Sequence, residues 1–271
     1  MIIDTHAHLN FNAYNKDLAS VISKTLSDDI WMINVGSKYE TSKKAVEIAE
    51  KYNRGVYAAV GLHPIYSASE FVKVRADKEE GGFAINQEDF DINNYKELAL
   101  NDKVVAIGEI GLDYYYRPKA NNKLELFKNK QKEVFLKQLD LAKELNLPVI
   151  LHSRMAHNDL IDILDGSLKG VIHCFTGAWD DAEKYLNMGY YLGFNGIIFK
   201  LDLNEVIKKA PMDRILVETD CPYLTPYKAK ASRNEPLFVK YIIERIAELK
   251  GISFKETADM TFENAAKLFK L

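Results

Sequence analysis

Short apolar, β-rich runs recur along this chain and alternate with segments in which apolar residues repeat with the period of a helix. The predicted strands cover about residues 2–8, 30–36, 56–62, 103–110, 147–152, 170–175, 190–195 and 214–219. The predicted helices run near residues 39–52, 131–146, 155–165, 178–188 and 235–250. Regular alternation of strand and helix is typical of parallel βαβ units, so the pattern predicts an α/β protein.

The number of units decides between the two common forms of a parallel sheet. Eight units in 271 residues predict one domain over 1–271, a single TIM-type (β/α)₈ barrel, and an open doubly wound sheet is the alternative. The stretch at about 67–91 is too long for an ordinary connection between a strand and a helix. We expect an insertion there, either a solvated surface loop or a loop that shapes the substrate site.

Composition narrows the range of partners. The chain has 36 basic and 39 acidic residues, a net charge of −3, so any attraction for nucleic acid must be local. No apolar run approaches the ~20 residues of a membrane span, and no basic leader precedes the first predicted strand. Two cysteines, Cys174 and Cys221, are too few for a disulfide framework. We therefore expect a cytoplasmic monomer that makes no membrane contact.

Side chains that can bind metal stand where the predicted strands end. The set is His6, His8, Glu109, His152, His173 and Asp220. In barrels of this type the carboxyl ends of the strands carry the active site, so the pattern predicts one shared site. Four imidazoles and two carboxylates suit Zn²⁺ or Mn²⁺, and they suffice for two ions if one carboxylate bridges them.

The spacing of the first pair supports this interpretation. Side chains of a strand repeat every two residues, so His6 and His8 point to the same face and can bind one cation, although a structural pair is the alternative.

Asp113 and Glu218 are expected to support the site from outside. Cys174 is expected to point away from it as a small buried hydrophobe, as is Cys221.

Groups suited to phosphate stand near the same predicted mouth. His63 ends the third predicted strand, and Arg154 follows His152 by two positions, so that its guanidinium could clamp two phosphate oxygens. The loop after the eighth strand adds cations, including Lys230 and Arg233, together with tyrosines, which are elements of a single-strand binding surface. The alternatives are a structural salt bridge for Arg154 and ordinary solvated lysines in the loop.

At these residues the sequence resembles the TatD deoxyribonucleases, which are metal-dependent hydrolases with amidohydrolase-like barrels. The matching stretches are Ile3–Leu9, Gly61–Pro64, Gly108–Tyr114, Leu151–Arg154, Ile172–Gly177, Glu218–Pro226 and Asn234–Pro236. They occur in the family's order and span nearly the whole chain. The resemblance implies that the six residues at the strand ends bind two divalent ions, Zn²⁺, Mg²⁺ or Mn²⁺, and that Glu109 bridges them. The segment 67–91 is longer than usual for the family.

These observations predict a metal-dependent, exonuclease-like deoxyribonuclease that hydrolyses phosphodiester bonds of DNA, with single-stranded ends as the expected substrate. Asp220 and Glu109 are the candidate catalytic residues: the metals activate a water, and Asp220 orients or deprotonates it. His63, Arg154, Lys230 and Arg233 are the candidate substrate contacts. One alternative is a hydrolase of a cyclic amide, lactone or ester with the same metal chemistry. Another is a nucleic-acid-binding barrel without activity.

Overall fold

The computed structural model describes residues 1–72, 78–80 and 88–271. In these ranges eight parallel strands form one sheet whose order in space is the order in sequence, from β1 to β8. The strands are β1 (Ile2–Ala7), β2 (Ile30–Val35), β3 (Val56–Val60), β4 (Val104–Asp113), β5 (Val149–Arg154), β6 (Gly170–Ile172), β7 (Tyr191–Phe194) and β8 (Ile215–Val217). The predicted parallel barrel is confirmed, and all eight strands lie where the apolar pattern placed them.

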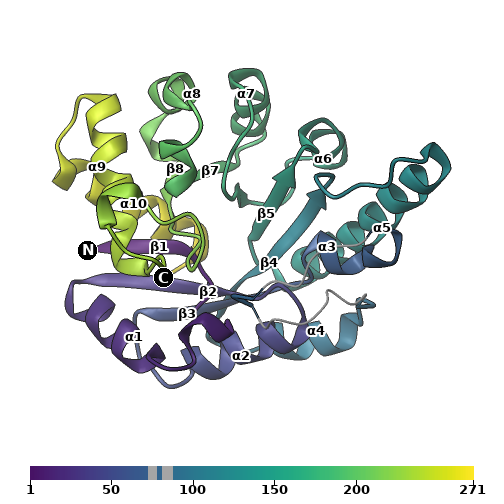
Figure 1. The fold of residues 1–271 in the computed structure, drawn as a ribbon, viewed down its shortest axis with the longest axis horizontal. Helices are drawn as coiled ribbons and strands as arrows, with labels where there is room; N and C mark the ends of the chain where they lie inside the picture. Colours follow the sequence, from purple (N-terminus) through teal and green to yellow (C-terminus); the bar gives the residue numbers. More distant parts are fainter. Residues whose placement is uncertain (73–77, 81–87) are drawn as a thin grey trace.

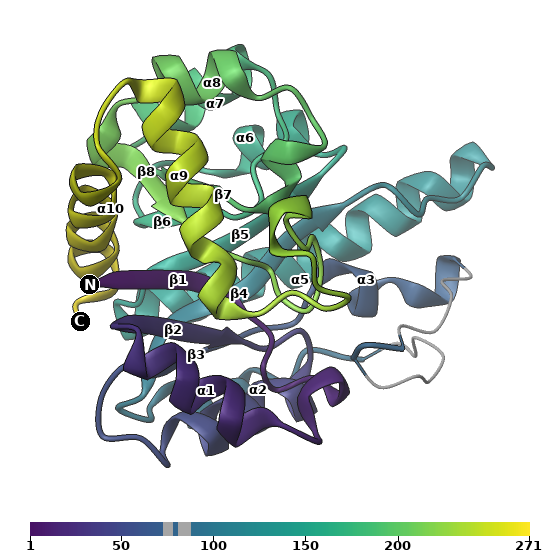
Figure 2. The ribbon, with the colours of Figure 1, turned by 60° about the vertical axis from the view of Figure 1, so that its left-hand side comes forward.

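Helices cover the outside of this sheet (Figure 1). They are α1 (Leu18–Ser27), α2 (Tyr39–Ala49), α3 (Pro64–Ser67), α4 (Ile92–Ala99), α5 (Asn121–Leu145), α6 (His157–Ile163), α7 (Trp179–Asn187), α8 (Asn204–Lys209), α9 (Val239–Lys250) and α10 (Phe254–Phe269). The start of α5 lies ten residues before the predicted 131, because residues 121–130 are mostly polar and only Phe127 among them is buried, so the apolar pattern is weak there. This end of α5 extends away from the barrel (Figure 2).

The inside of the barrel is a separate apolar cluster with a contribution from every strand. Its strand members are Ile3, Ile33, Val35, Ala59, Val105, Ala106, Ile150, Val171, Tyr191 and Leu216. Ala265, Leu268 and Phe269 of α10 join the same cluster, so the last helix closes one end of the barrel. The amino ends of the strands are therefore packed with apolar side chains, and polar groups gather at the other end.

The barrel is nearly closed between its first and last strands. A single parallel bridge links Ala7 to Cys221, and the backbone NH of Asp220 donates to the carbonyl of His6 at 2.8 Å. Buried Asp4 accepts hydrogen bonds from the backbone NH of Thr219 at 2.9 Å and from its hydroxyl at 2.5 Å. The two termini lie side by side next to β1 (Figures 1 and 2).

The predicted insertion at 67–91 falls partly on residues 73–77 and 81–87, which lie outside the described residues. Within the described ranges, no helix is long and apolar enough to cross a membrane.

Candidate metal centre

A cavity of about 400 Å³ opens at the carboxyl ends of the strands. Its wall contains His8, His63, Glu109, Asp113, His152, Arg154, His173 and Asp220. His6 is fully buried and stacks on the ring of His173, with 3.6 Å between the ring centroids. The structure therefore brings together all six residues that the sequence proposed as metal ligands, along with His63 and Arg154.

Strand periodicity accounts for the direction of two of these side chains. Ile150 and Val171 belong to the apolar cluster inside the barrel. His152 and His173 each follow one of them by two residues, so they point to the same inner face one layer higher. At the carboxyl ends the inner layer thus changes from apolar residues to imidazoles.

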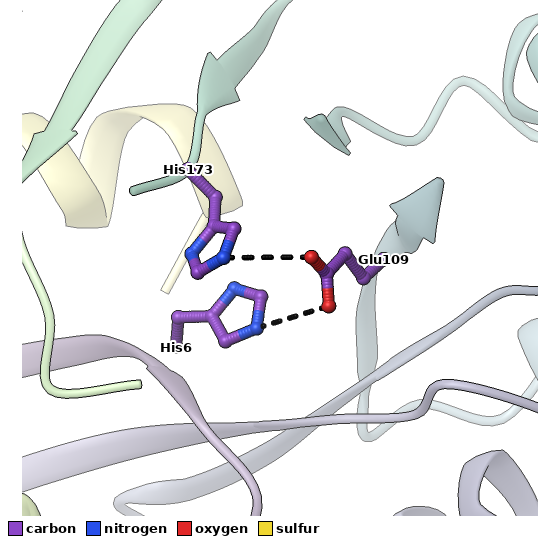
Figure 3. Close-up of side chains that lie close together, drawn as sticks. All are labelled: His6, Glu109 and His173. Atoms are coloured by element: carbon purple, nitrogen blue, oxygen red, sulfur yellow. Dashed lines mark ion pairs between the residues drawn. The ribbon is translucent and has the colours of Figure 1, made fainter. Parts of the chain in front are cut away.

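The carboxylate of Glu109 lies at the centre of the site. One oxygen is 3.4 Å from Nε2 of His173 and the other is 3.6 Å from Nε2 of His6 (Figure 3). Nδ1 of His152 is 2.6 Å from the first oxygen, and Nε2 of His63 is 3.7 Å from it. Four imidazoles from four strand ends therefore converge on one buried carboxylate.

A second group of candidate metal ligands, formed by His6, His8 and Asp220, shares His6 with the group around Glu109. Nε2 of His6 is 3.1 Å from Nε2 of His8, and the carboxylate of Asp220 is 3.4 Å from His8 and 3.9 Å from His6. Nδ1 of His8 lies 2.8 Å from the carbonyl of Val35. A neutral His8 that donates this hydrogen bond keeps the lone pair of Nε2 directed toward Asp220 and His6, as a metal ligand requires.

Two further carboxylates hold the imidazoles from outside, as the sequence led us to expect. Glu218 is fully buried and lies 2.8 Å from Nδ1 of His173. Asp113 lies 3.3 Å from Nε2 of His152 and also accepts from Nε of Arg154 at 3.0 and 3.1 Å. Such partners fix the orientation of an imidazole and make it a better ligand.

The charges of the cluster favour a cation at its centre. Burial raises the pKa of Glu109, but the imidazoles of His63 and His173 outweigh it and hold that pKa well below its usual value. Burial lowers the pKa of His173, but the carboxylates of Glu218 and Glu109 raise it to about 10. Without a metal, a proton thus supplies the positive charge that these carboxylates require.

The spacing of the donor atoms also fits metal ions. Ligands of a four-coordinate Zn²⁺ at about 2.1 Å lie about 3.4 Å from one another, close to the distances of 3.1 to 3.9 Å within the two groups. Candidate ion sites are formed by His6 with Glu109 and His173, and by His6 with His8 and Asp220.

Two other groups of donors extend this set. His152 lies in a group with His63 and Asp113 rather than with His6. Cys174 forms the other group with His173 and Asp220, and it lines the cavity. The expectation that Cys174 points away from the site is therefore wrong. Strand β6 ends at Ile172, and Cys174 has a φ of 45°, so strand alternation no longer directs its side chain. Cys221 is fully buried and does not line the cavity, as expected.

The loop after β8 does not bring its predicted cations into the cavity wall. Arg233 is bound by both oxygens of Asp17, at 2.9 and 2.7 Å, and by Glu235 at 3.1 Å. Lys230 is exposed and is not among the residues that line the cavity. Lys228, from the same loop, lies 3.7 Å from Glu244.

Three wall residues carry no signal in the sequence. The carboxylate of Glu80 accepts hydrogen bonds from the hydroxyls of Ser37 and Tyr66, and all three side chains line the cavity. The backbone next to it is fixed by the NH of Ala13, which donates to the carbonyl of Glu79 at 3.0 Å. Part of the predicted insertion therefore reaches the mouth of the barrel.

A parallel eight-stranded barrel with imidazoles and carboxylates gathered at the carboxyl ends of its strands defines the class of metal-dependent hydrolases. The family described as TatD related DNase matches residues 3–270. The chain belongs to this family, the TatD family of metal-dependent hydrolases.

Individual relatives agree with this assignment. The chain is 42% identical to the "Uncharacterized metal-dependent hydrolase YabD" of Bacillus subtilis, with 100% of both chains covered. It is 33% identical to the "3'-5' ssDNA/RNA exonuclease TatD" of Rahnella sp., with 97% of this chain and 96% of that one covered. The crystal structure of YJJV, a TatD homolog from Escherichia coli, superposes with a TM-score of 0.82 at 28% identity and covers 100% of this chain and 98% of that one.

Proposed function

We propose that this chain is a divalent-metal-dependent deoxyribonuclease that hydrolyses phosphodiester bonds of DNA, with single-stranded ends as its substrate. The name of the Rahnella relative, a 3'-5' exonuclease of single-stranded DNA and RNA, supports this class of substrate. The proposed metal ligands are His6, His8, Glu109, His152, His173 and Asp220. Glu109 is assigned to serve two ions, since one of its oxygens faces Nε2 of His6 while the other is closest to His152. Bound divalent ions supply an activated water and neutralise phosphate charge.

The observation that carries the choice of a phosphodiester is the state of Arg154. Asp113 holds this guanidinium through Nε and through Nη2, the latter at 2.7 Å, while the side chain remains 40% exposed in the cavity wall. Nη1 has no hydrogen-bond acceptor within the described part of the chain. A fixed, charged donor that still has a free NH₂ group beside a metal centre is suited to bind a phosphate oxygen.

Asp220 is assigned the proton transfer. Its carboxylate lines the cavity, is 15% exposed, and lies 3.4 Å from Nε2 of His8. Burial raises its pKa, but the hydrogen bond with His8 and the charge of His173 outweigh it and hold the pKa below its usual value, so the group is an anion that can accept a proton. His63, which also lines the cavity, is assigned to orient the phosphate.

End-labelled single-stranded and duplex DNA, incubated with Mg²⁺, Mn²⁺ or Zn²⁺, tests the proposal. We expect stepwise shortening of the single strand, abolished by a chelator and restored by metal. A panel of cyclic amides, lactones and esters is assayed in parallel. Metal-dependent turnover confined to that panel would replace the phosphodiester with a carbon centre, and tight binding of DNA without turnover would indicate a barrel that only binds.

A further inference from the structure

The chain needs a local surface that attracts a nucleic acid strand, because its net charge is −3. The loop after β8 is a poor source, since Asp17 and Glu235 neutralise Arg233 and Glu244 lies near Lys228. A different segment at the cavity mouth has the required chemistry. Residues 114–120 connect β4, which carries Glu109, to α5.

Two aromatic rings of this segment are open to solvent. Tyr115 is 55% exposed and Tyr116 is 42% exposed, and adjacent exposed rings of this kind can mark an interaction site. Their centroids are 4.9 Å apart with an interplanar angle of 89°. The two rings therefore present surfaces in different directions, and a base can stack on either without displacing the other.

These rings are continuous with the cavity through Arg154. Its guanidinium lies over both of them, with 4.6 Å from Cζ to the centroid of Tyr115 and 5.3 Å to that of Tyr116. The same guanidinium belongs to the cavity wall. A strand whose phosphate is held by Arg154 would thus have its neighbouring bases at the two tyrosines.

The surrounding charge also suits a polyanion. Between residues 114 and 132 there are six basic residues and one acidic residue, Glu125. Three of the lysines are paired: Lys128 and Lys132 with Asp159, and Lys130 with Asp89. Arg117 is exposed and donates to the carbonyl of Tyr114 at 3.1 Å, and no carboxylate of the described residues forms an ion pair with it.

We propose that Tyr115, Tyr116 and Arg117 form a stacking platform for the bases of a single-stranded nucleic acid adjacent to the bond that is cleaved. The inference rests on the phosphodiesterase activity proposed above and assigns the surface that holds the strand. Aromatic rings for bases and an unpaired cation for the backbone are the means by which proteins bind single strands without reading their sequence. Binding at this platform should therefore depend on the presence of bases in the strand but not on which bases they are.

Binding and turnover are measured separately on the full-length protein with Mn²⁺. Fluorescence anisotropy gives the Kd for a labelled phosphorothioate single strand that resists hydrolysis, and for a strand of equal length made of abasic units. We expect the wild type to bind the base-bearing strand at least about tenfold more tightly, since stacking contributes about 1–3 kcal/mol per base. The double variant Tyr115→Ala with Tyr116→Ala should lose that preference, and the double Tyr→Phe variant, which keeps both rings, should retain it.

Three controls make the result specific. Leu100→Ala removes a side chain that is 66% exposed just before β4, at the opposite end of that strand, and should leave both Kd values unchanged. Tyr227→Ala tests the loop after β8, and loss of the preference there instead would overturn the platform. A smaller particle for the double alanine variant in light scattering would show that the rings join two copies of the chain, which also overturns it.

Failure of the platform is distinguishable from failure of the proposed function. If the double alanine variant has an unchanged Kd and the wild type cleaves ordinary DNA, the platform is refuted and the proposed function stands. If the wild type binds the strand through these rings but cleaves neither DNA nor bis(4-nitrophenyl) phosphate, the phosphodiesterase activity is refuted and the platform is still supported.

Discussion

The carboxylate of Glu218 lies 2.8 Å from Nδ1 of His173, while Nε2 of the same ring faces Glu109 at 3.4 Å. A buried carboxylate in this position fixes the ring and increases the basicity of the nitrogen that faces the site. Glu218 also accepts hydrogen bonds from the backbone NH of Cys174 at 2.7 Å and from the side chain of Asn195 at 3.1 Å. These two hydrogen bonds fix the position of the Glu218 carboxylate.

Glu218→Gln should keep this shape and remove the charge. We expect metal affinity to fall about 10- to 100-fold, the usual cost of losing such a partner, with little change in the circular dichroism of the fold. Titration against a competing chelator measures the affinity. Asp213→Asn is the matched control, since Asp213 is an exposed carboxylate at the other end of β8 and should have no effect. Equal affinity of Glu218→Gln and wild type would contradict the role.

Glu109→Gln and Asp220→Asn should fail in different ways. If Glu109 is shared by two ions, its negative charge helps to hold both. The Glu109→Gln variant should therefore retain less metal, and its turnover should stay low even with excess metal. Asp220→Asn should keep much of its metal and lose turnover by at least the ~10²–10⁴-fold typical of general acid–base catalysis. Elemental analysis alongside rates across a metal titration separates the two defects. Full rescue of Asp220→Asn by added metal would remove its catalytic assignment.

Arg154→Ala should weaken phosphate binding and spare the metals, because a guanidinium does not ligate a cation. We expect kcat/KM on DNA to fall about 10- to 150-fold, equivalent to the roughly 1.5–3 kcal/mol of a charged hydrogen bond. Arg154→Lys should recover little, since an ammonium cannot hold Asp113 and a phosphate oxygen in the same geometry. Wild-type kinetics for Arg154→Ala would reduce Arg154 to a structural partner of Asp113.

Gly111→Ala should destabilise the fold beside the site. Gly111 has a φ of +140°, and a Cβ there would lie 2.1 Å from the carbonyl oxygen of His152 on β5. We expect a loss of about 2–4 kcal/mol in the free energy of unfolding, measured in urea, together with weaker metal binding as His152 shifts. Gly189→Ala is the control. Gly189 has a φ of +87°, but a Cβ there would have no neighbouring atom within 4 Å, so backbone strain alone should cost about 1–2 kcal/mol. Similar losses in both variants would show that His152 is not displaced.

The sequence pattern predicted the features that depend on strand periodicity. Eight apolar runs placed the strands, and the residues that end them converge because parallel strands share one carboxyl edge. Neither feature depends on the conformation of the loops. The direction of His152 and His173 follows from this periodicity, because the backbone NH of His173 still pairs with β5, whereas Cys174 has a φ of 45° and no longer follows it.

Contacts between distant loops could not be predicted in this way. Arg233 is paired with Asp17, 216 residues away, and the cation expected at the mouth is neutralised by that contact. Glu80 reaches the cavity from the insertion because hydroxyls of Ser37 and Tyr66 hold it. Local sequence contains no periodic signal for such pairings, since they depend on how the loops pack over the finished barrel.

The seam between β1 and β8 has a consequence for the order of events during synthesis. His6 and His8 are synthesised more than 200 residues before Asp220 and Cys221, which lie against them in the folded protein. A nascent chain can pair the early strands as they emerge, but the His6, His8 and Asp220 group can form only after β8 has been synthesised. Until β8 has been made, the edge of β1 has no strand to meet there, and the group of His6, His8 and Asp220 is incomplete.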